Sequence, residues 1–356
     1  MSRRQRALNS FSNKLLSLVT TRRRKKAARA VEQRILRLQD DGECLVFCTH
    51  EDGVLHDAAR MADLAAYPNL YEDFAIDHVF VMGNLLGTGS AGVVWSANFK
   101  SDNTRTVAIK EISKRHSYWM GNEERRADTT RREVMILQQI TECNIPGIGK
   151  ICAAIETKDH LYIIMADVCT GGHLCSKMLE NGEPFTEART AFVAQSLAAT
   201  LVGLHSLNIV HRDLKLENVL FKTKDESSDV MLIDFGLSNT LNCANAQLKS
   251  CVGTCLFMAP EIYKITERTD EKRGYSEKVD VWGLGVVMFT MLSNRLPFWA
   301  ETREQLRQQV AKGAVFEPNR SVSSCPPLLS YTSQPIIQAA NTAYASRPRL
   351  STRSWY

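Results

Sequence analysis

Three glycines, Gly87, Gly89 and Gly92, form a pattern that could bring backbone N–H groups close to a phosphate. Glycine has no Cβ atom, so phosphate oxygens can approach its backbone closely. In dinucleotide-binding folds such a loop opens a helix, but residues 93–96 continue with the β-branched and aromatic residues of a strand. The pattern therefore favours a glycine loop between two strands, lying over nucleotide phosphates. An ordinary glycine-rich hairpin and a dinucleotide-dependent enzyme are the alternatives.

A longer set of motifs follows this loop in a fixed order. It comprises Val107-Ala108-Ile109-Lys110, His211-Arg212-Asp213-Leu214-Lys215-Leu216-Glu217-Asn218, Asp234-Phe235-Gly236, Gly253-Thr254, Met258-Ala259-Pro260-Glu261 and Asp280-Val281-Trp282-Gly283. Each motif alone is weak, but the ordered set is highly specific. From about residue 79 to about residue 318 the chain resembles eukaryotic protein kinases. The motifs are most similar to those of serine/threonine kinases of the calcium/calmodulin-dependent group, with the AMP-activated kinases as the nearest relatives within it.

The resemblance implies an α+β, two-lobed protein kinase fold, with a small β-rich lobe, a larger helical lobe and an atypical C-terminal end. It also implies transfer of the γ-phosphoryl group of ATP to serine and threonine hydroxyls of protein substrates, with Mg²⁺ as cofactor. The apolar pattern agrees with this fold. Strand-like segments dominate up to residue 165, and helical spacing begins after residue 185.

The catalytic roles implied by the resemblance suit the chemistry of the residues. Asp213 would accept a hydrogen bond from the substrate hydroxyl, and Lys215 would steady the transferring phosphoryl group. Asn218 and Asp234 would supply oxygen ligands to Mg²⁺, a hard cation that keeps several waters and binds the ATP phosphates. The reaction asks for positioning and charge neutralisation rather than for a covalent intermediate.

Residues before and after the motif at 211–218 are expected to bind the nucleotide. Lys110, in a predicted strand, would pair with the α- and β-phosphates, and Glu133 in a predicted helix would hold the lysine side chain. Residues 166–168 would form the hinge that reads the adenine edge. The ATP-binding residues implied by the resemblance are Leu86, Gly87, Thr88, Gly89, Ser90, Ala91, Gly92, Val94, Ala108, Lys110, Met165, Val168 and Leu220.

Regulation by phosphorylation is expected at Ser250. It stands four residues before Thr254 and matches the activation-loop phosphorylation site of the family. A phosphate adds about −1.5 to −2 charge and would be clamped by Arg212, which orders the segment. An upstream activating kinase is therefore an expected partner, alongside protein substrates. A plain loop serine is the alternative.

Two features depart from the family pattern. His173 occupies a position where many relatives carry a carboxylate that reads a basic residue of the substrate, whereas Glu217 is retained. A weakened preference for basic substrates is therefore expected. After Pro318 the chain is rich in serine and proline, and Pro326-Pro327 breaks any helix. The alternative function is accordingly a nucleotide-binding pseudokinase or scaffold with an incomplete large lobe.

The domain organisation expected is a basic, partly disordered leader at 1–39, an extension at 40–78 that packs on or near the kinase domain, and the kinase domain at 79–356. The leader contains the basic run 22–26, followed by Ala28, Val31 and Ile35 at helical spacing. Cys44, Cys48, His50 and His56 match no common structural zinc pattern.

Composition and charge exclude several protein classes. The chain is 44% hydrophobic and 23% charged, which excludes a wholly disordered or collagen-like protein. Residues 1–31 hold ten basic and no acidic residues, while the remainder carries 34 basic against 39 acidic, so nucleic-acid binding is not expected. The longest apolar run, 281–292, is too short to span a membrane, so no integral membrane segment is expected.

We expect a cytoplasmic protein. The basic run 22–26 leaves nuclear import, mitochondrial targeting and contact with anionic lipid as alternatives, beside a simply solvated tail.

Overall fold

The computed structural model describes residues 25, 28–29, 31–33, 35–36, 45–48, 76–89, 92–113, 123–157, 159–241, 247–265 and 274–313. The candidates Ser90 and Ala91, the leader before residue 25, Cys44, His50, His56 and the segment beyond residue 313 lie outside these ranges. The chain divides into two compact units. The first comprises Met1–Tyr118, Leu137–Asn144 and Gly149–Val168, and the second comprises the rest.

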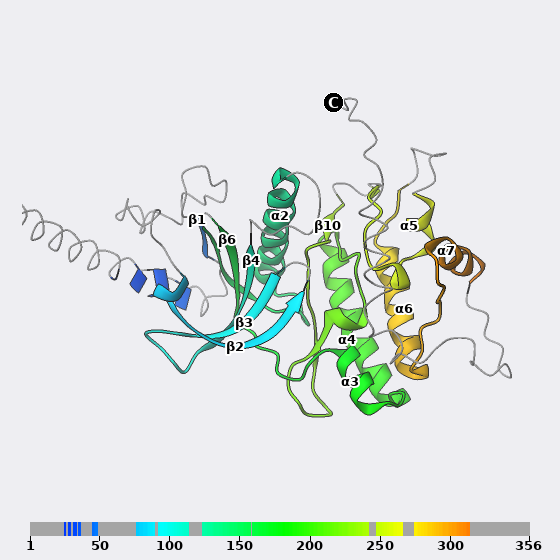
Figure 1. Ribbon diagram of the computed structural model, residues 1–356, viewed down its shortest axis with the longest axis horizontal. Helices are drawn as coiled ribbons and strands as arrows, with labels where there is room; N and C mark the ends of the chain where they lie inside the picture. Colours follow the sequence, from blue (N-terminus) through cyan, green and yellow to red (C-terminus); the bar gives the residue numbers. More distant parts are fainter. Residues whose placement is uncertain are drawn as a thin grey trace, which may run out of the picture. The chain divides into compact units, whose positions relative to one another are not determined.

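A mixed β-sheet forms the first unit (Figure 1). Its six strands, counted over the described residues, are ordered β1-β5-β6-β4-β3-β2. Strands β2 to β6 pair antiparallel, whereas β1 runs parallel to β5 at the edge. The bounds are β1 Leu45–Cys48, η1 Ile76–His78, β2 Phe80–Gly89, β3 Gly92–Phe99, β4 Thr106–Ser113, β5 Ile151–Glu156 and β6 His160–Met165.

The strands of this sheet alternate in the direction of their side chains. In β4, Val107 and Ile109 are fully buried in a core cluster with Phe80 and Phe99. Ala108 and Lys110 alternate with them and so face the other side of the sheet. Gly87 and Gly89 lie at the end of β2, Gly92 begins β3, and the two strands pair antiparallel, as the sequence predicted.

Helices dominate the second unit (Figure 1). The elements after β6 are α3 Leu174–Asn181, α4 Glu187–Ser206, β7 Ile209–Val210, η2 Leu216–Asn218, β8 Val219–Phe221, β9 Val230–Leu232, β10 Asn239–Thr240, η3 Cys255–Phe257, α5 Pro260–Lys264, α6 Lys278–Ser293 and α7 Arg303–Lys312. Helix α2, Glu123–Glu142, has its first part in the second unit and its last part in the first. The α+β prediction is confirmed.

Local sequence signals explain where several of these helices begin. The hydroxyl of Thr186 accepts from the Arg189 amide at the start of α4. Thr302 and Gln305 form a reciprocal capping box at the start of α7, which satisfies two amides that the helix leaves without partners. Within the described part of the chain, no helix is both long enough and apolar enough to cross a membrane.

Candidate functional site

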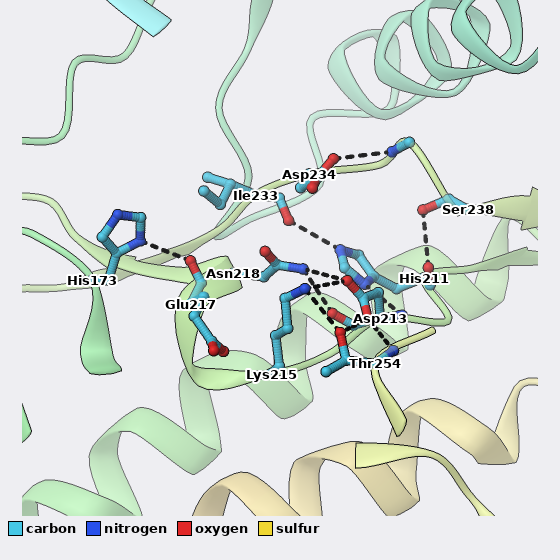
Figure 2. Close-up of polar contacts among 11 residues, drawn as sticks. His173, His211, Asp213, Lys215, Glu217, Asn218, Ile233, Asp234, Ser238 and Thr254 are labelled. Carbon is cyan, nitrogen blue, oxygen red and sulfur yellow. Dashed lines mark hydrogen bonds and ion pairs between the residues drawn. The ribbon is translucent and has the colours of Figure 1, made fainter. Parts of the chain in front are cut away.

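The carboxylate of Asp213 is the centre of a polar cluster in the second unit (Figure 2). Its Oδ1 accepts from both the amide and the hydroxyl of Thr254, each at 2.8 Å. Its Oδ2 lies 2.7 Å from Nζ of Lys215, which also donates to the Thr254 hydroxyl at 2.9 Å. These three groups fix the carboxylate through a closed set of charge-assisted contacts.

Burial and charge act in opposite directions on Lys215. Burial alone would lower the pKa of its ammonium group, because removing a charge from water is costly. Burial is the largest single effect, but the charge and hydrogen bond of Asp213, together with the charges of Glu217 and Asp234, outweigh it, so the pKa of Lys215 is raised above its ordinary value. The side chain is therefore held as a fixed cation beside Asp213.

Asn218 is held by its amide nitrogen. Nδ2 donates to the backbone oxygen of Asp213 at 2.8 Å and to Oδ2 of the same residue at 3.2 Å. The amide oxygen is thereby turned away from Asp213, and in Figure 2 it lies on the side of Asp234. One amide oxygen and one carboxylate fit a magnesium site whose remaining ligands are waters and phosphate oxygens.

The backbone at Asp234 adopts an uncommon conformation. Its φ of 67° lies in the left-handed region, which costs free energy for a residue with a side chain. The Gly236 amide donates to Asp234 Oδ1 at 3.3 Å. A Cβ atom at position 236 would lie 3.5 Å from a carboxylate oxygen of the buried Glu133. That distance is an ordinary contact, whereas the same Cβ atom would lie a tight 3.3 Å from Asp234 Oδ1, so glycine relieves crowding at the Asp234 carboxylate.

His211 joins the catalytic loop to the segment that carries Asp234. Its Nδ1 lies 3.4 Å from the Asp213 amide, which can only donate, and its Nε2 lies 3.2 Å from the carbonyl oxygen of Ile233. In this arrangement Nδ1 accepts from the Asp213 amide and Nε2 donates to the Ile233 carbonyl oxygen. The edge of the ring also packs against Phe235, with centroids 5.0 Å apart.

Asp280 was named above only as part of a motif, but its side chain hydrogen-bonds to the backbone of the loop at His211 and Arg212. The side chain is 1% exposed. Its Oδ2 accepts from the His211 amide at 2.9 Å and its Oδ1 from the Arg212 amide at 2.8 Å. His205 Nε2 also lies 2.9 Å from Oδ2. The sequence signal that could have identified this residue is a single carboxylate at the start of an apolar helix. A carboxylate buried there needs hydrogen-bond donors as partners.

Arg212 contacts the candidate phosphorylation site. Its Nη1 donates to the Ser250 hydroxyl at 2.7 Å and to the Tyr275 hydroxyl at 3.2 Å, and its Nε donates to the carbonyl oxygen of Leu237. The Tyr275 hydroxyl in turn donates to the Ser250 carbonyl oxygen at 2.8 Å. Arg212 is 8% exposed, and no carboxylate of the described residues forms an ion pair with it. A buried cation thus faces a serine hydroxyl.

Glu217 and His173 meet through the backbone. His173 Nδ1 donates to the carbonyl oxygen of Glu217 at 2.8 Å. Oε2 of Glu217 is buried and has no hydrogen-bond partner within the described ranges. A carboxylate oxygen in this state favours a cationic or hydrogen-bonding ligand.

The remaining nucleotide-binding candidates lie in the first unit, except Leu220 in β8 of the second. Val94 of β3 pairs in register with Lys110 of β4, and Ala108 pairs with Met165 of β6. Leu86, Gly87, Thr88 and Gly89 end β2, and Val168 follows β6. At Gly92 a Cβ atom would collide with the carbonyl oxygen of Glu111. Only glycine fits there. Lys110 belongs to the first unit and Glu133 to the second.

Comparison with known proteins agrees with this geometry. The protein kinase domain family matches residues 80–348. The chain is 32% identical over 255 residues to calcium-dependent protein kinase 29 of Arabidopsis thaliana, which covers 71% of the chain and 42% of that protein. It is 32% identical over 239 residues to calcium/calmodulin-dependent protein kinase type 1 of Macrobrachium nipponense, covering 67% and 64%.

A third relative is serine/threonine-protein kinase 33 of Bos taurus, 31% identical over 261 residues, which covers 70% of the chain and 50% of that protein. The chain spans about two fifths of the length of calcium-dependent protein kinases 29 and 10 of Arabidopsis thaliana. The resemblance inferred from the sequence motifs is confirmed.

Proposed function

Because the chain belongs to the protein kinase family, we propose that it transfers the γ-phosphoryl group of ATP to serine and threonine hydroxyls of protein substrates. The observation that carries this proposal is the set of contacts around Asp213, in which Thr254 and Lys215 hold a buried carboxylate in one orientation. Its relatives include several serine/threonine kinases.

Asp213 has one role in this reaction. The carboxylate accepts a hydrogen bond from the substrate hydroxyl and points its oxygen at the phosphorus for in-line attack. The orientation matters more than basicity, because the transition state is loose and needs little help with proton removal. Thr254 and Lys215 supply that orientation, since each contacts the carboxylate directly.

Lys215 has a second role in the proposal. Its ammonium group stays charged because the pKa is raised, so it can neutralise charge on the transferring phosphoryl group while it still contacts Asp213. The Thr254 hydroxyl, 2.9 Å from Nζ, fixes the direction of the lysine side chain. A mobile lysine would lose much of this effect, because the benefit comes from preorganised charge.

ATP and Mg²⁺ are the reactants and cofactor that protein kinases use in general. When bound, Mg²⁺ supplies neutralisation of phosphate charge. We assign its protein ligands to Asn218 and Asp234, and the phosphate contacts to Lys110 with Glu133 as its anchor. The glycine loop at 87–92 and the apolar residues Leu86, Val94, Ala108, Met165, Val168 and Leu220 would enclose the nucleotide.

Phosphorylation of Ser250 would switch the activity on. Arg212 already donates to the Ser250 hydroxyl, and it carries a buried charge that no described carboxylate balances. A phosphate on that hydroxyl would form short, charge-assisted hydrogen bonds with the guanidinium group. The backbone of Arg212 is fixed by Asp280 and precedes Asp213 directly, so an ordered Ser250 segment steadies the catalytic loop.

The substrate preference proposed is for a basic residue near the phosphorylated hydroxyl. Glu217 lies next to Asn218 and keeps a buried carboxylate oxygen without a hydrogen-bond partner in the described part of the chain. His173 replaces a second carboxylate, so the preference is weaker than where both are present. Peptides with a single arginine or lysine at varied positions would measure it.

The decisive experiment is phosphate transfer from Mg-ATP to a mixed serine/threonine peptide library. Wild type and Asp213→Asn are compared after Ser250 has been phosphorylated by an upstream kinase. We expect transfer by wild type and loss of at least a hundredfold in the variant. If the phosphorylated wild type transfers nothing but still binds Mg-ATP, the chain is a nucleotide-binding scaffold instead.

A further inference from the structure

Strand β5 of the first unit's sheet is buried on both of its faces. All six residues of β5 are buried, although successive side chains of a strand point to opposite sides. In β4, Val107 and Ile109 are fully buried on the face opposite Lys110. A strand that is apolar on both faces needs a cover on each of them, because exposed apolar surface of that size is unfavourable.

Residues from the N-terminal leader supply one of these covers. Ala28, Val31 and Ile35 are helical and are 5%, 0% and 0% exposed. They belong to the same core cluster as Phe80, Phe99, Val107, Ile109, Cys152 and Ile155. The spacing of three and four residues places them on one side of a helix.

The opposite side of the same helix is polar. Lys25, Arg29 and Gln33 are all exposed. The helix therefore has the two-sided pattern of a segment that packs on a folded core. It buries aliphatic residues against the sheet and presents Lys25 and Arg29 to solvent.

A buried ionisable group fixes the position of this helix. Glu32 is 3% exposed, and its Oε1 accepts from the backbone amide of Ser101 at 2.7 Å, just after β3. Burying a carboxylate is costly unless it is hydrogen-bonded. A helix that slid by one turn would lose this contact, so the packing is specific rather than a loose hydrophobic association.

The strand that follows in the sequence extends the sheet. β1 pairs parallel with β5 over four residues, from Leu45 opposite Ala153 to Cys48 opposite Glu156. It thereby covers the free hydrogen-bonding edge of β5, which would otherwise be open to other chains. Both elements lie before residue 80, where the family match begins.

We propose that the described helical residues between Lys25 and Leu36 and strand β1 are an integral part of the first unit, a cover for its sheet that the kinase family model does not include. The folded catalytic chain then begins near Lys25 rather than near Phe80. Any targeting segment that is removed by cleavage must end before Lys25, because the residues after it are needed in the core. The basic run at 22–26 is tethered to the kinase by this cover.

The test uses the full chain with a specific protease site inserted between Arg60 and Met61. After cleavage, the N-terminal fragment and the body are passed together over a size-exclusion column at 0.1 M and 1 M salt, and the fragment is identified by mass spectrometry. We expect co-elution at both salt concentrations, because the contact is apolar. Elution of the fragment alone would overturn the proposal, and release only at high salt would show that charge alone holds the leader.

Two substitutions that each introduce a lysine into the helix make this test more specific. Val31→Lys places a charge on the buried side of the helix, and Gln33→Lys places one on the exposed side as its matched control. We expect Val31→Lys to reduce the retained fragment at least tenfold and the control to retain it fully. Equal retention in both variants would contradict the proposal. If Val31→Lys prevents folding, co-elution or separate elution of the two parts of the cleaved wild-type chain still supports or overturns the proposal.

Discussion

The amide and the hydroxyl of Thr254 donate to the same carboxylate oxygen of Asp213, each over 2.8 Å. The two residues are 41 positions apart in sequence. Thr254 lies at the end of the segment that carries Ser250, so that segment directly contacts the carboxylate that we propose to be catalytic. A change of conformation at Ser250 can therefore reach Asp213 without any relay.

Thr254→Val tests the hydroxyl half of this contact. Valine has the shape of threonine but cannot donate to Asp213 or accept from Lys215, while the backbone amide still donates. We expect kcat to fall by about 10- to 100-fold, because a carboxylate held on one side only is less well oriented. Steady-state assays with Mg-ATP and a peptide substrate would measure kcat and KM. Thr254→Ser is the control and should retain most of the activity.

Tyr275→Phe tests the clamp around Ser250. The substitution removes one hydroxyl that accepts from Arg212 and donates to the Ser250 carbonyl oxygen, and it leaves the aromatic packing in place. We expect a smaller gain in activity when Ser250 is phosphorylated, by roughly threefold to tenfold, since two hydrogen bonds with modest net contributions are lost. The ratio of activities before and after phosphorylation is the readout, and an unchanged ratio would contradict this role.

Ser250→Ala should prevent activation altogether. The alanine chain should keep the low activity of the unphosphorylated wild type after incubation with an upstream kinase. Mass spectrometry of the wild-type chain would confirm phosphate at Ser250. Full activity of Ser250→Ala would show that the serine is an ordinary loop residue.

Asp280→Ala should destabilise the second unit and lower activity together. The substitution leaves the amides of His211 and Arg212 buried without their acceptor, and each such loss costs about 1–3 kcal/mol. Urea unfolding would measure the free energy of unfolding, and peptide assays would measure kcat. Val281→Ala, at an exposed neighbouring position, is the matched control and should change neither quantity appreciably.

Much of this arrangement was predictable from the sequence because local patterns specify it. The strand containing Lys110 and the glycine loop between two strands follow from residue type and spacing. A helix was expected around Glu133. Helix α2 begins earlier, at Glu123, in a charged stretch that lacks apolar residues at helical spacing and so gave no signal.

The contacts that could not be predicted join residues far apart in sequence. Asp280 reaches His211 over 69 positions, and Tyr275 reaches Arg212 over 63 positions. Such pairs depend on how helices pack, which local propensity does not determine. The pairing of β1 with β5 is of the same kind, because a parallel pair requires a long connection and leaves no turn signal in the sequence.

The pH dependence of stability follows from the raised pKa of Lys215. A cation whose pKa is higher in the folded than in the unfolded state contributes stability fully below the unfolded value. That contribution is lost as the pH rises through the folded pKa. We expect the difference in unfolding free energy between wild type and Lys215→Met to be constant from pH 7 to 10. It should shrink above about pH 10.5, the ordinary pKa of lysine. A difference that shrank below pH 9 would contradict the assignment.

Removal of Mg²⁺ and substitution of its proposed ligand should have linked effects. A chelator should abolish phosphate transfer in the wild-type chain. Asp234→Asn should raise the Mg²⁺ concentration needed for half-maximal activity at least tenfold, because a neutral amide binds a hard cation less well than a carboxylate. High Mg²⁺ should restore part of the lost activity in Asp234→Asn but none in Asp280→Asn, since Asp280 acts on the backbone of the loop. Equal rescue of both variants would show that Asp234 acts through the fold and does not bind the metal.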